Sequence, residues 1–223
     1  MKGIQGSQPR RRARALAVVV LLLGVLFCAP SIAHAPALVG LRVLPHADRE
    51  SSFSGWTHEG PVPAALAVPV ELGDDLFGTT LQLQPVKPGE TYRVRVQYET
   101  SLALGAEGPH LDLIDWKHCT STWQAAQAVD AVSFVLPTPT AEQHSCFPAY
   151  TRAELDAAVR AHGVKQGDPT LAEGWLPNLD KSDAVGAVTP YVGISTVRVR
   201  VEVKRQGAWV AVTTVEFALP MGC

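Results

Sequence analysis

The chain has 223 residues, of which 47% are hydrophobic and 18% are charged, and this balance excludes a disordered protein. The formal net charge of −2 hides an uneven distribution, because the first 35 residues contain five basic residues and no acidic one. The remaining residues include 14 basic and 21 acidic ones, which gives a net charge of −7. This part of the chain therefore lacks the excess of basic residues that is typical of a nucleic-acid-binding protein.

The amino-terminal segment has the layout of a secretory signal peptide. Basic residues within positions 10–14 precede an apolar run at positions 15–27, and small residues follow, with cleavage expected after Ala33 or Ala35. The run is shorter than the roughly 20 residues that span a bilayer as a helix, and a retained membrane anchor is the alternative. We therefore predict a signal peptide at residues 1–35 and a periplasmic or secreted mature chain that does not span a membrane.

The cysteines fit an exported protein, because disulfide bonds persist in oxidising compartments. Cys28 would leave with the signal peptide, so Cys119, Cys146 and Cys223 remain in the mature chain. We predict a disulfide between Cys119 and Cys146, which closes the shorter loop, and bridges that use Cys223 are the alternative.

Alternating apolar and polar residues predict strands along most of the mature chain. The first six are expected at residues 38–45, 64–72, 79–84, 90–104, 111–116 and 131–136. Pro69 should confine the second of these to a sheet edge or a bulge, because proline cannot donate a ladder hydrogen bond.

One helix is expected at residues 151–162. Thr151 and Glu154 have the spacing of a capping box, apolar residues recur at helical spacing after them, and Gly163 is expected to end the helix. Residues 167–185 show no periodicity and are expected to form a loop.

The carboxyl-terminal region predicts a hairpin that turns at Gln206 and Gly207. Valines alternate with charged residues over positions 197–204, and Trp209 is expected to join Val215 and Phe217 on the buried face of the return strand. Many strands, one short inserted helix and no βαβ alternation predict a mainly β protein. We expect an antiparallel β-sandwich, immunoglobulin-like or jelly-roll, with residues 36–223 as a single domain.

Residues 81–98, LQLQPVKPGETYRVRVQY, read as strand, turn and strand. Their spacing of Leu81, Pro85, Pro88 and Tyr92 resembles the E–F corner of fibronectin type III domains, where a tyrosine begins strand F and bonds back across the turn. Tyr92 would take that role here. The Pro-Gly-x-x-Tyr pattern is also similar to jelly-roll carbohydrate-binding modules. The resemblance implies a sandwich fold in the wider immunoglobulin-like superfamily and no particular function.

The densest group of polar residues contains His110, Asp112, Asp115 and His118, which invites a metal site. Strand parity places Asp115 on the opposite face from His110 and Asp112, and no zinc-type spacing is present. We therefore expect a polar strand rim, with no metal or other cofactor. His34 carries an alternative, because as the mature amino terminus it could chelate copper in a secreted copper protein or enzyme.

No catalytic constellation is evident, and a G-x-S-x-G nucleophile elbow is absent from the sequence. Trp56, Trp116 and Trp123 fall in expected loops or at strand ends, where ligand platforms often lie. We predict a non-catalytic exported protein that binds a protein or glycan in the bacterial envelope through loops 46–63, 105–130 and 137–150. A structural subunit of an envelope or secretion assembly, which adds strands edge to edge, is a further alternative.

Overall fold

The structure is a computed structural model that describes residues 37–46, 53–105, 110–179 and 187–221. The chain divides into two units after Ala35, and the first unit lies outside the described residues. The predicted signal peptide and His34 belong to that unit, and Cys223 also lies outside the described residues. The described part is mainly β, with two sheets, and confirms the predicted sandwich class.

The first sheet has five strands in the order β2-β1-β4-β10-β9. Strand β1 (Leu38–Leu44) pairs antiparallel with β2 (Trp56–Glu59) on one side and with β4 (Thr80–Pro85) on the other. Strand β10 (Ser133–Val135) connects β4 to β9 (Gln127–Ala128), also antiparallel. Strand β2 lies within residues 46–63, which were expected to be a loop.

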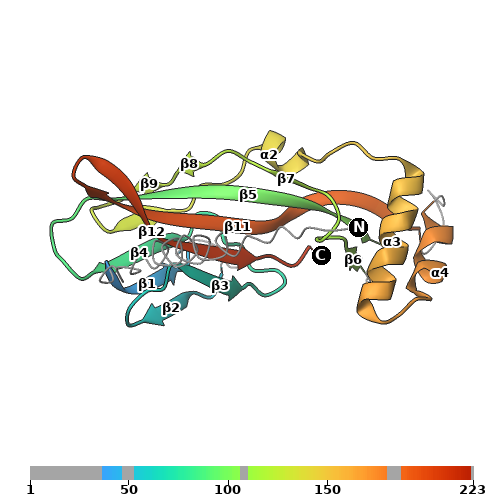
Figure 1. Cartoon of the computed structure of the whole chain (residues 1–223), viewed down its shortest axis with the longest axis horizontal. Coiled ribbons are helices and arrows are strands. Elements are labelled where there is room, and N and C mark those ends of the chain that lie inside the picture. The colour runs from blue at the N-terminus through green and yellow to red at the C-terminus, as the bar shows by residue number, and fades with distance from the viewer. Residues whose placement is uncertain (1–36, 47–52, 106–109, 180–186, 222–223) are drawn as a thin grey trace, which may run out of the picture. The chain divides into compact units, whose positions relative to one another are not determined.

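The second sheet is built on two long strands that pair antiparallel over most of their length, β5 (Tyr92–Gly105) and β11 (Thr189–Arg205) (Figure 1). Strand β12 (Ala208–Ala218) forms the predicted hairpin with β11. Strand β3 (Ala65–Pro69) pairs parallel with β12 at the end of the sheet, so the edge position predicted from its proline is confirmed.

Three short strands pair one after another along the other edge of β5. They are β6 (His110–Asp112), β7 (His118–Thr120) and β8 (Gln124–Ala125), and all three are antiparallel to β5. Residues 110–125 therefore follow β5 back along its edge, and they carry several of the predicted site residues.

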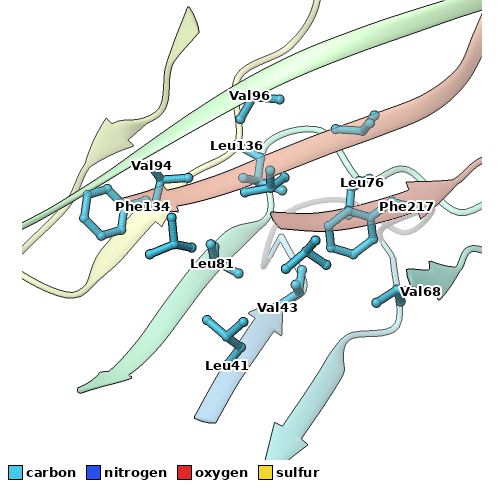
Figure 2. Packing of buried hydrophobic residues seen from close by; sticks show 14 of the residues in the cluster. Leu41, Val43, Val68, Leu76, Leu81, Val94, Val96, Phe134, Leu136 and Phe217 are labelled. Atoms are coloured by element: carbon cyan, nitrogen blue, oxygen red, sulfur yellow. The ribbon is translucent and has the colours of Figure 1, made fainter. Parts of the chain in front are cut away.

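The main core lies between the two sheets. Figure 2 shows Val94 of β5 and Phe217 of β12 on one side, with Leu41, Leu81 and Phe134 of the five-stranded sheet on the other. All five side chains are almost fully buried, and they give each sheet one apolar face toward the other sheet.

The segment at residues 81–98 links the two sheets, because β4 and β5 belong to different sheets and do not pair with each other. Tyr92 begins β5, as the resemblance to a fibronectin corner implies. Its hydroxyl donates to the Glu90 carboxylate at 2.6 Å and lies 3.3 Å from the Ala37 carbonyl oxygen. The Tyr92 hydroxyl therefore links a side chain of the turn to the residue that precedes β1.

A second core lies beyond the sandwich, where the far ends of β5 and β11 meet two helices. Leu102 and Leu104 of β5 pack with Leu155 and Val159 of α3 (Arg152–Gln166) and with the helix α4 (Leu171–Trp175). Figure 1 shows both helices at this end of the long strands.

The helices differ from the prediction in number and in extent. The capping box of Thr151 and Glu154 is present, but α3 continues to Gln166, and Gly163 lies buried inside it. A β-carbon on Gly163 would lie 2.6 Å from the Asp168 carbonyl oxygen, so close packing requires glycine there. Gly167, with φ of 75°, ends the helix, since glycine adopts this left-handed conformation without strain.

The expected loop at residues 167–185 instead contains α4 and a 3₁₀ turn, η1 (Leu176–Asn178). A further short helix, α2 (Ala141–Ser145), lies in the expected loop at 137–150. Segments of three to five residues are too short for a helical period to show in a sequence.

Trp209 does not lie in the core, contrary to the prediction. A bulge in β12 shifts the register between the pairs Val201–Thr213 and Glu202–Ala211. The extra residue reverses the alternation, so Trp209 lies on the outer face of the sheet, where the Arg93 guanidinium carbon is 4.4 Å from its ring centroid.

Candidate binding site

A cavity of about 230 Å³ lies between α3 and the turn that follows β6. It is lined by Leu113, Asp115, Trp116, Ala158, Ala161, His162 and Lys165. The four helical residues are spaced by three, four and seven positions, so they share one face of α3. The two alanines on this face leave the space that forms the cavity.

Trp116 forms a wall of the cavity and is held in place by other aromatic rings. Its ring contacts Tyr150 at 5.5 Å and Phe147 at 6.1 Å between centroids. The ammonium of Lys117 lies 5.3 Å from the same ring centroid and pairs with Glu154 at 2.8 Å. The wall is therefore tied to the first turn of α3 before any ligand arrives.

The rim of the cavity is charged. The Lys165 ammonium donates to the Asp115 carboxylate at 2.5 Å, and both side chains are more than half exposed. The hydrogen bond and the charge of Lys165 lower the pKa of Asp115, with a smaller contribution from His162. A carboxylate and an ammonium thus flank an apolar cavity and can exchange partners with polar atoms of a ligand.

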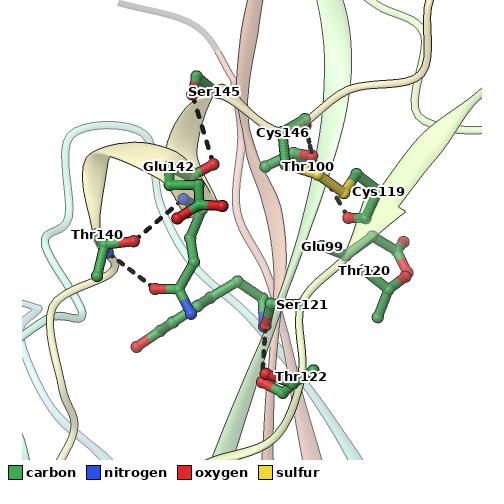
Figure 3. The surroundings of a disulfide bond; sticks show 12 residues. Glu99, Thr100, Cys119, Thr120, Ser121, Thr122, Thr140, Glu142, Ser145 and Cys146 are labelled. Carbon is green, nitrogen blue, oxygen red and sulfur yellow. Dashed lines mark hydrogen bonds between the residues drawn. A yellow bond between two sulfur atoms is a disulfide. The ribbon is translucent and has the colours of Figure 1, made fainter.

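The predicted disulfide between Cys119 and Cys146 is present in the structure (Figure 3). It joins β7 to the segment that follows α2. The Thr100 hydroxyl of β5 lies within hydrogen-bonding distance of the carbonyl oxygens of both cysteines. The bridge therefore holds the segment leading to Phe147 and Tyr150 against β5, and it supports the wall of the cavity indirectly.

The three tryptophans predicted as a ligand platform lie in separate places. Trp56 begins β2, where its ring stacks on His58 and packs against the sandwich core. Trp123 lies over the Arg200 guanidinium, with 4.2 Å between the guanidinium carbon and the ring centroid. Of the three, Trp116 is the one that lines the α3 cavity.

The polar group at residues 110–118 is also dispersed. His110 and Asp112 share a face of β6, with 3.7 Å between the imidazole and the carboxylate, whereas Asp115 pairs with Lys165. Within the described ranges, no three His, Cys, Asp or Glu side chains are placed to hold a metal ion. None of the helices in the described part of the chain is long and apolar enough to cross a membrane.

A second cavity, of about 490 Å³, adjoins the corner between β4 and β5 and the turn between β9 and β10. Glu90 and Tyr92 contribute polar atoms to it, together with Asp130. The Asp130 carboxylate accepts the backbone N–H groups of Val132 and Ser133, both at 2.7 Å, and these bonds lower its pKa. Asp130 is therefore already engaged in closing its own turn.

The sequence indicated Trp116 as a candidate binding residue but not the helical side of the α3 cavity. Ala158 and His162 contribute to the helical period that predicted a helix at residues 151–162 and no site, whereas Ala161 and Lys165 carried no signal in the sequence. Comparison of the chain with protein-family models, curated proteins and solved structures finds no match. The class that the fold defines is a two-sheet, mainly β protein with a helical layer at one end of its long strands.

Proposed function

We propose that this is an exported, non-catalytic binding protein that receives one apolar side chain of a protein partner in the α3 cavity. The observation that carries the proposal is the cavity itself, with its apolar floor, its fixed aromatic wall and its charged rim. Its volume of about 230 Å³ is below the roughly 300–1,000 Å³ of pockets that enclose a whole small ligand. Such a space suits a single anchoring side chain, which is how a few central residues dominate protein interfaces.

A protein partner is favoured over a glycan at this cavity because Trp116 has little free ring surface. Lys117 lies over its ring, and Phe147 and Tyr150 contact it from other directions. A sugar needs an open aromatic face for stacking, whereas an inserted side chain needs only a wall. The Asp115–Lys165 pair at the rim would then bind polar groups that flank the anchor.

Export to the bacterial envelope is supported by the signal-peptide layout of residues 1–35 and by the Cys119–Cys146 disulfide. An immunoglobulin-like sandwich is supported by Tyr92, which begins β5 at a corner between two sheets. Domains of this architecture often bind through structures at one end, and here that end carries α3.

The proposal can be tested by filling the cavity. Ala161→Leu places a larger side chain on the cavity face of α3, and Ala153→Leu makes the same change at an exposed position on another face. The wild type and the two variants would each carry a photo-crosslinking residue at position 162. Each purified protein would be incubated with envelope extract, and the crosslinked proteins would be identified by mass spectrometry.

We expect one partner to be crosslinked by the wild type and by Ala153→Leu, and its recovery to fall at least about tenfold with Ala161→Leu. Equal recovery of that partner by all three proteins would contradict docking in the cavity. If Ala161→Leu lost binding to an oligosaccharide and still crosslinked the protein, the cavity would be assigned to a glycan.

A further inference from the structure

The outer face of the seven-stranded sheet carries arginines on neighbouring strands. Arg93 and Arg95 alternate with buried residues along β5, and Arg198 and Arg200 do the same along β11. The register places Arg95 directly opposite Arg200. Like charges in directly opposed positions disfavour a sheet unless something else compensates them.

Two of these four arginines are neutralised by carboxylates. Arg93 pairs with the buried Glu202 at 2.5 Å, and Arg198 pairs with Glu99 at 2.7 Å and with Glu216 at 2.8 Å. Within the described ranges, no carboxylate lies at ion-pair distance from Arg95 or Arg200. Among the described residues, this pair of positive charges on two adjacent strands is therefore left without a carboxylate partner, on a chain that is acidic outside its first 35 residues.

Trp123 adjoins the same two guanidinium groups. Its ring lies over Arg200, and its carbonyl oxygen accepts a hydrogen bond from Arg95 at 3.3 Å. The pairing of β8 with β5 at Arg95 and Val96 fixes the segment that carries Trp123 beside these arginines. A guanidinium has five N–H donors, so most of those on Arg95 and Arg200 remain available.

We propose that Arg95, Arg200 and Trp123 form a binding surface for the carboxylate-bearing rings of an acidic polysaccharide, that is, a uronate polymer. A carboxylate offers two oxygens that match the fork of a guanidinium, and two opposed guanidinium groups can hold it from both sides. One face of the Trp123 indole is occupied by Arg200, and the opposite face would pack against the apolar face of a sugar ring. A uronate ring unites both features, whereas an Asp or Glu side chain of an acidic peptide would leave the indole unused.

This surface is distinct from the α3 cavity and does not depend on the function proposed for it. Arg95 lies on the sandwich part of β5, and the cavity lies at the helical end. The proposal therefore adds a second ligand class, recognised by charge and by ring stacking.

The test uses the purified protein and three soluble probes: polygalacturonate, its fully methyl-esterified form and poly-L-glutamate. Binding would be measured by isothermal titration calorimetry at low and high salt. Arg95→Gln with Arg200→Gln removes the pair, and Trp123→Ala removes the indole. Lys204→Gln is the control, because it removes one exposed positive charge from β11, the strand of Arg200, and leaves the pair intact.

We expect polygalacturonate to bind the wild type, and the dissociation constant to rise at least about tenfold in the double variant and change less than about twofold in Lys204→Gln. The methyl-esterified polymer should bind at least about tenfold more weakly, and high salt should weaken binding because it screens exposed charges. Trp123→Ala should weaken polygalacturonate binding and leave poly-L-glutamate binding unchanged.

Unchanged polygalacturonate binding by the double variant would overturn the proposal. Equal affinity of the wild type for poly-L-glutamate and polygalacturonate would also overturn it and would assign the surface to acidic proteins. If the double glutamine variant fails to fold, Arg95→Lys with Arg200→Lys keeps the charges and removes the forked geometry. That variant should lose most of the affinity, and wild-type affinity in it would refute recognition by the guanidinium fork.

Discussion

Replacing both Cys119 and Cys146 with serine should lower the free energy of unfolding by about 3.5 kcal/mol. The two cysteines are 27 residues apart, and the chain-entropy model for a loop of that length gives roughly 12 cal/mol/K of lost unfolded-state entropy. At 25 °C this corresponds to about 3.5 kcal/mol. The Thr100 hydroxyl bonds to the backbone carbonyls of the cysteines, so serine keeps those contacts and isolates the effect of the crosslink.

The measurement is urea unfolding without reductant, followed by tryptophan fluorescence, for the wild type and for the double serine variant. Cys223→Ser is the control, and we expect it to change the unfolding free energy by less than about 0.5 kcal/mol. A loss below about 1 kcal/mol in the double variant would refute the loop-entropy reasoning. An equal loss in Cys223→Ser would show that Cys223 belongs to the stabilising bridge, and titration of denatured protein for free thiols would identify the pairing.

Three further substitutions test the core, a buried hydroxyl and a helix cap. Phe217→Ala removes a ring with no exposed surface and should cost about 3–5 kcal/mol in urea unfolding. Tyr98→Phe leaves the two hydrogen-bond partners of a buried hydroxyl unsatisfied and should cost about 1–3 kcal/mol by the same assay. The hydrogen bonds from Lys117 and from the Thr151 backbone lower the pKa of Glu154 from 4.5 to about 2. The ionised form of Glu154 therefore stabilises the fold above pH 4.5, and this contribution is lost as the pH falls from 4.5 through about 2. Over that range, the thermal unfolding midpoint of Glu154→Gln should fall less than the midpoint of the wild type.

The strands with strict alternation could be predicted from the sequence because both of their faces have a fixed environment. Val94 and Val96 face the sandwich core, whereas Arg93 and Arg95 face outward. Apolar and charged residues therefore alternate along the strand, and this alternation is visible in the sequence. The helix start at Thr151 was equally clear, since a capping box is a local interaction among neighbouring residues.

Features that depend on tertiary structure could not be read in the same way. Trp209 was assigned to the core because its alternation was counted across a bulge that the sequence does not mark. The α3 cavity needed the turn after β6 to meet α3, and these segments are about 45 residues apart. Trp116 carried a signal as an aromatic residue near a strand end, but Ala161 and Lys165 become part of a site only through that contact.

A single pair of strands positions both proposed surfaces, and its geometry keeps them apart. Arg95 and Leu104 are nine residues apart on β5, which at about 3.3 Å per residue separates their backbones by roughly 30 Å. Between them, β11 bulges at Ser195, where its hydroxyl bonds to Ser101 at 2.7 Å and the register shifts. The bulge reverses the alternation on β11, so that Val197 faces the sandwich core and Val192 faces the helical core. Two cores that share strands but not side chains can be perturbed separately, since distant sites without common partners act additively. Filling the α3 cavity should therefore leave polyuronate binding intact, and removing the Arg95–Arg200 pair should leave crosslinking at α3 intact.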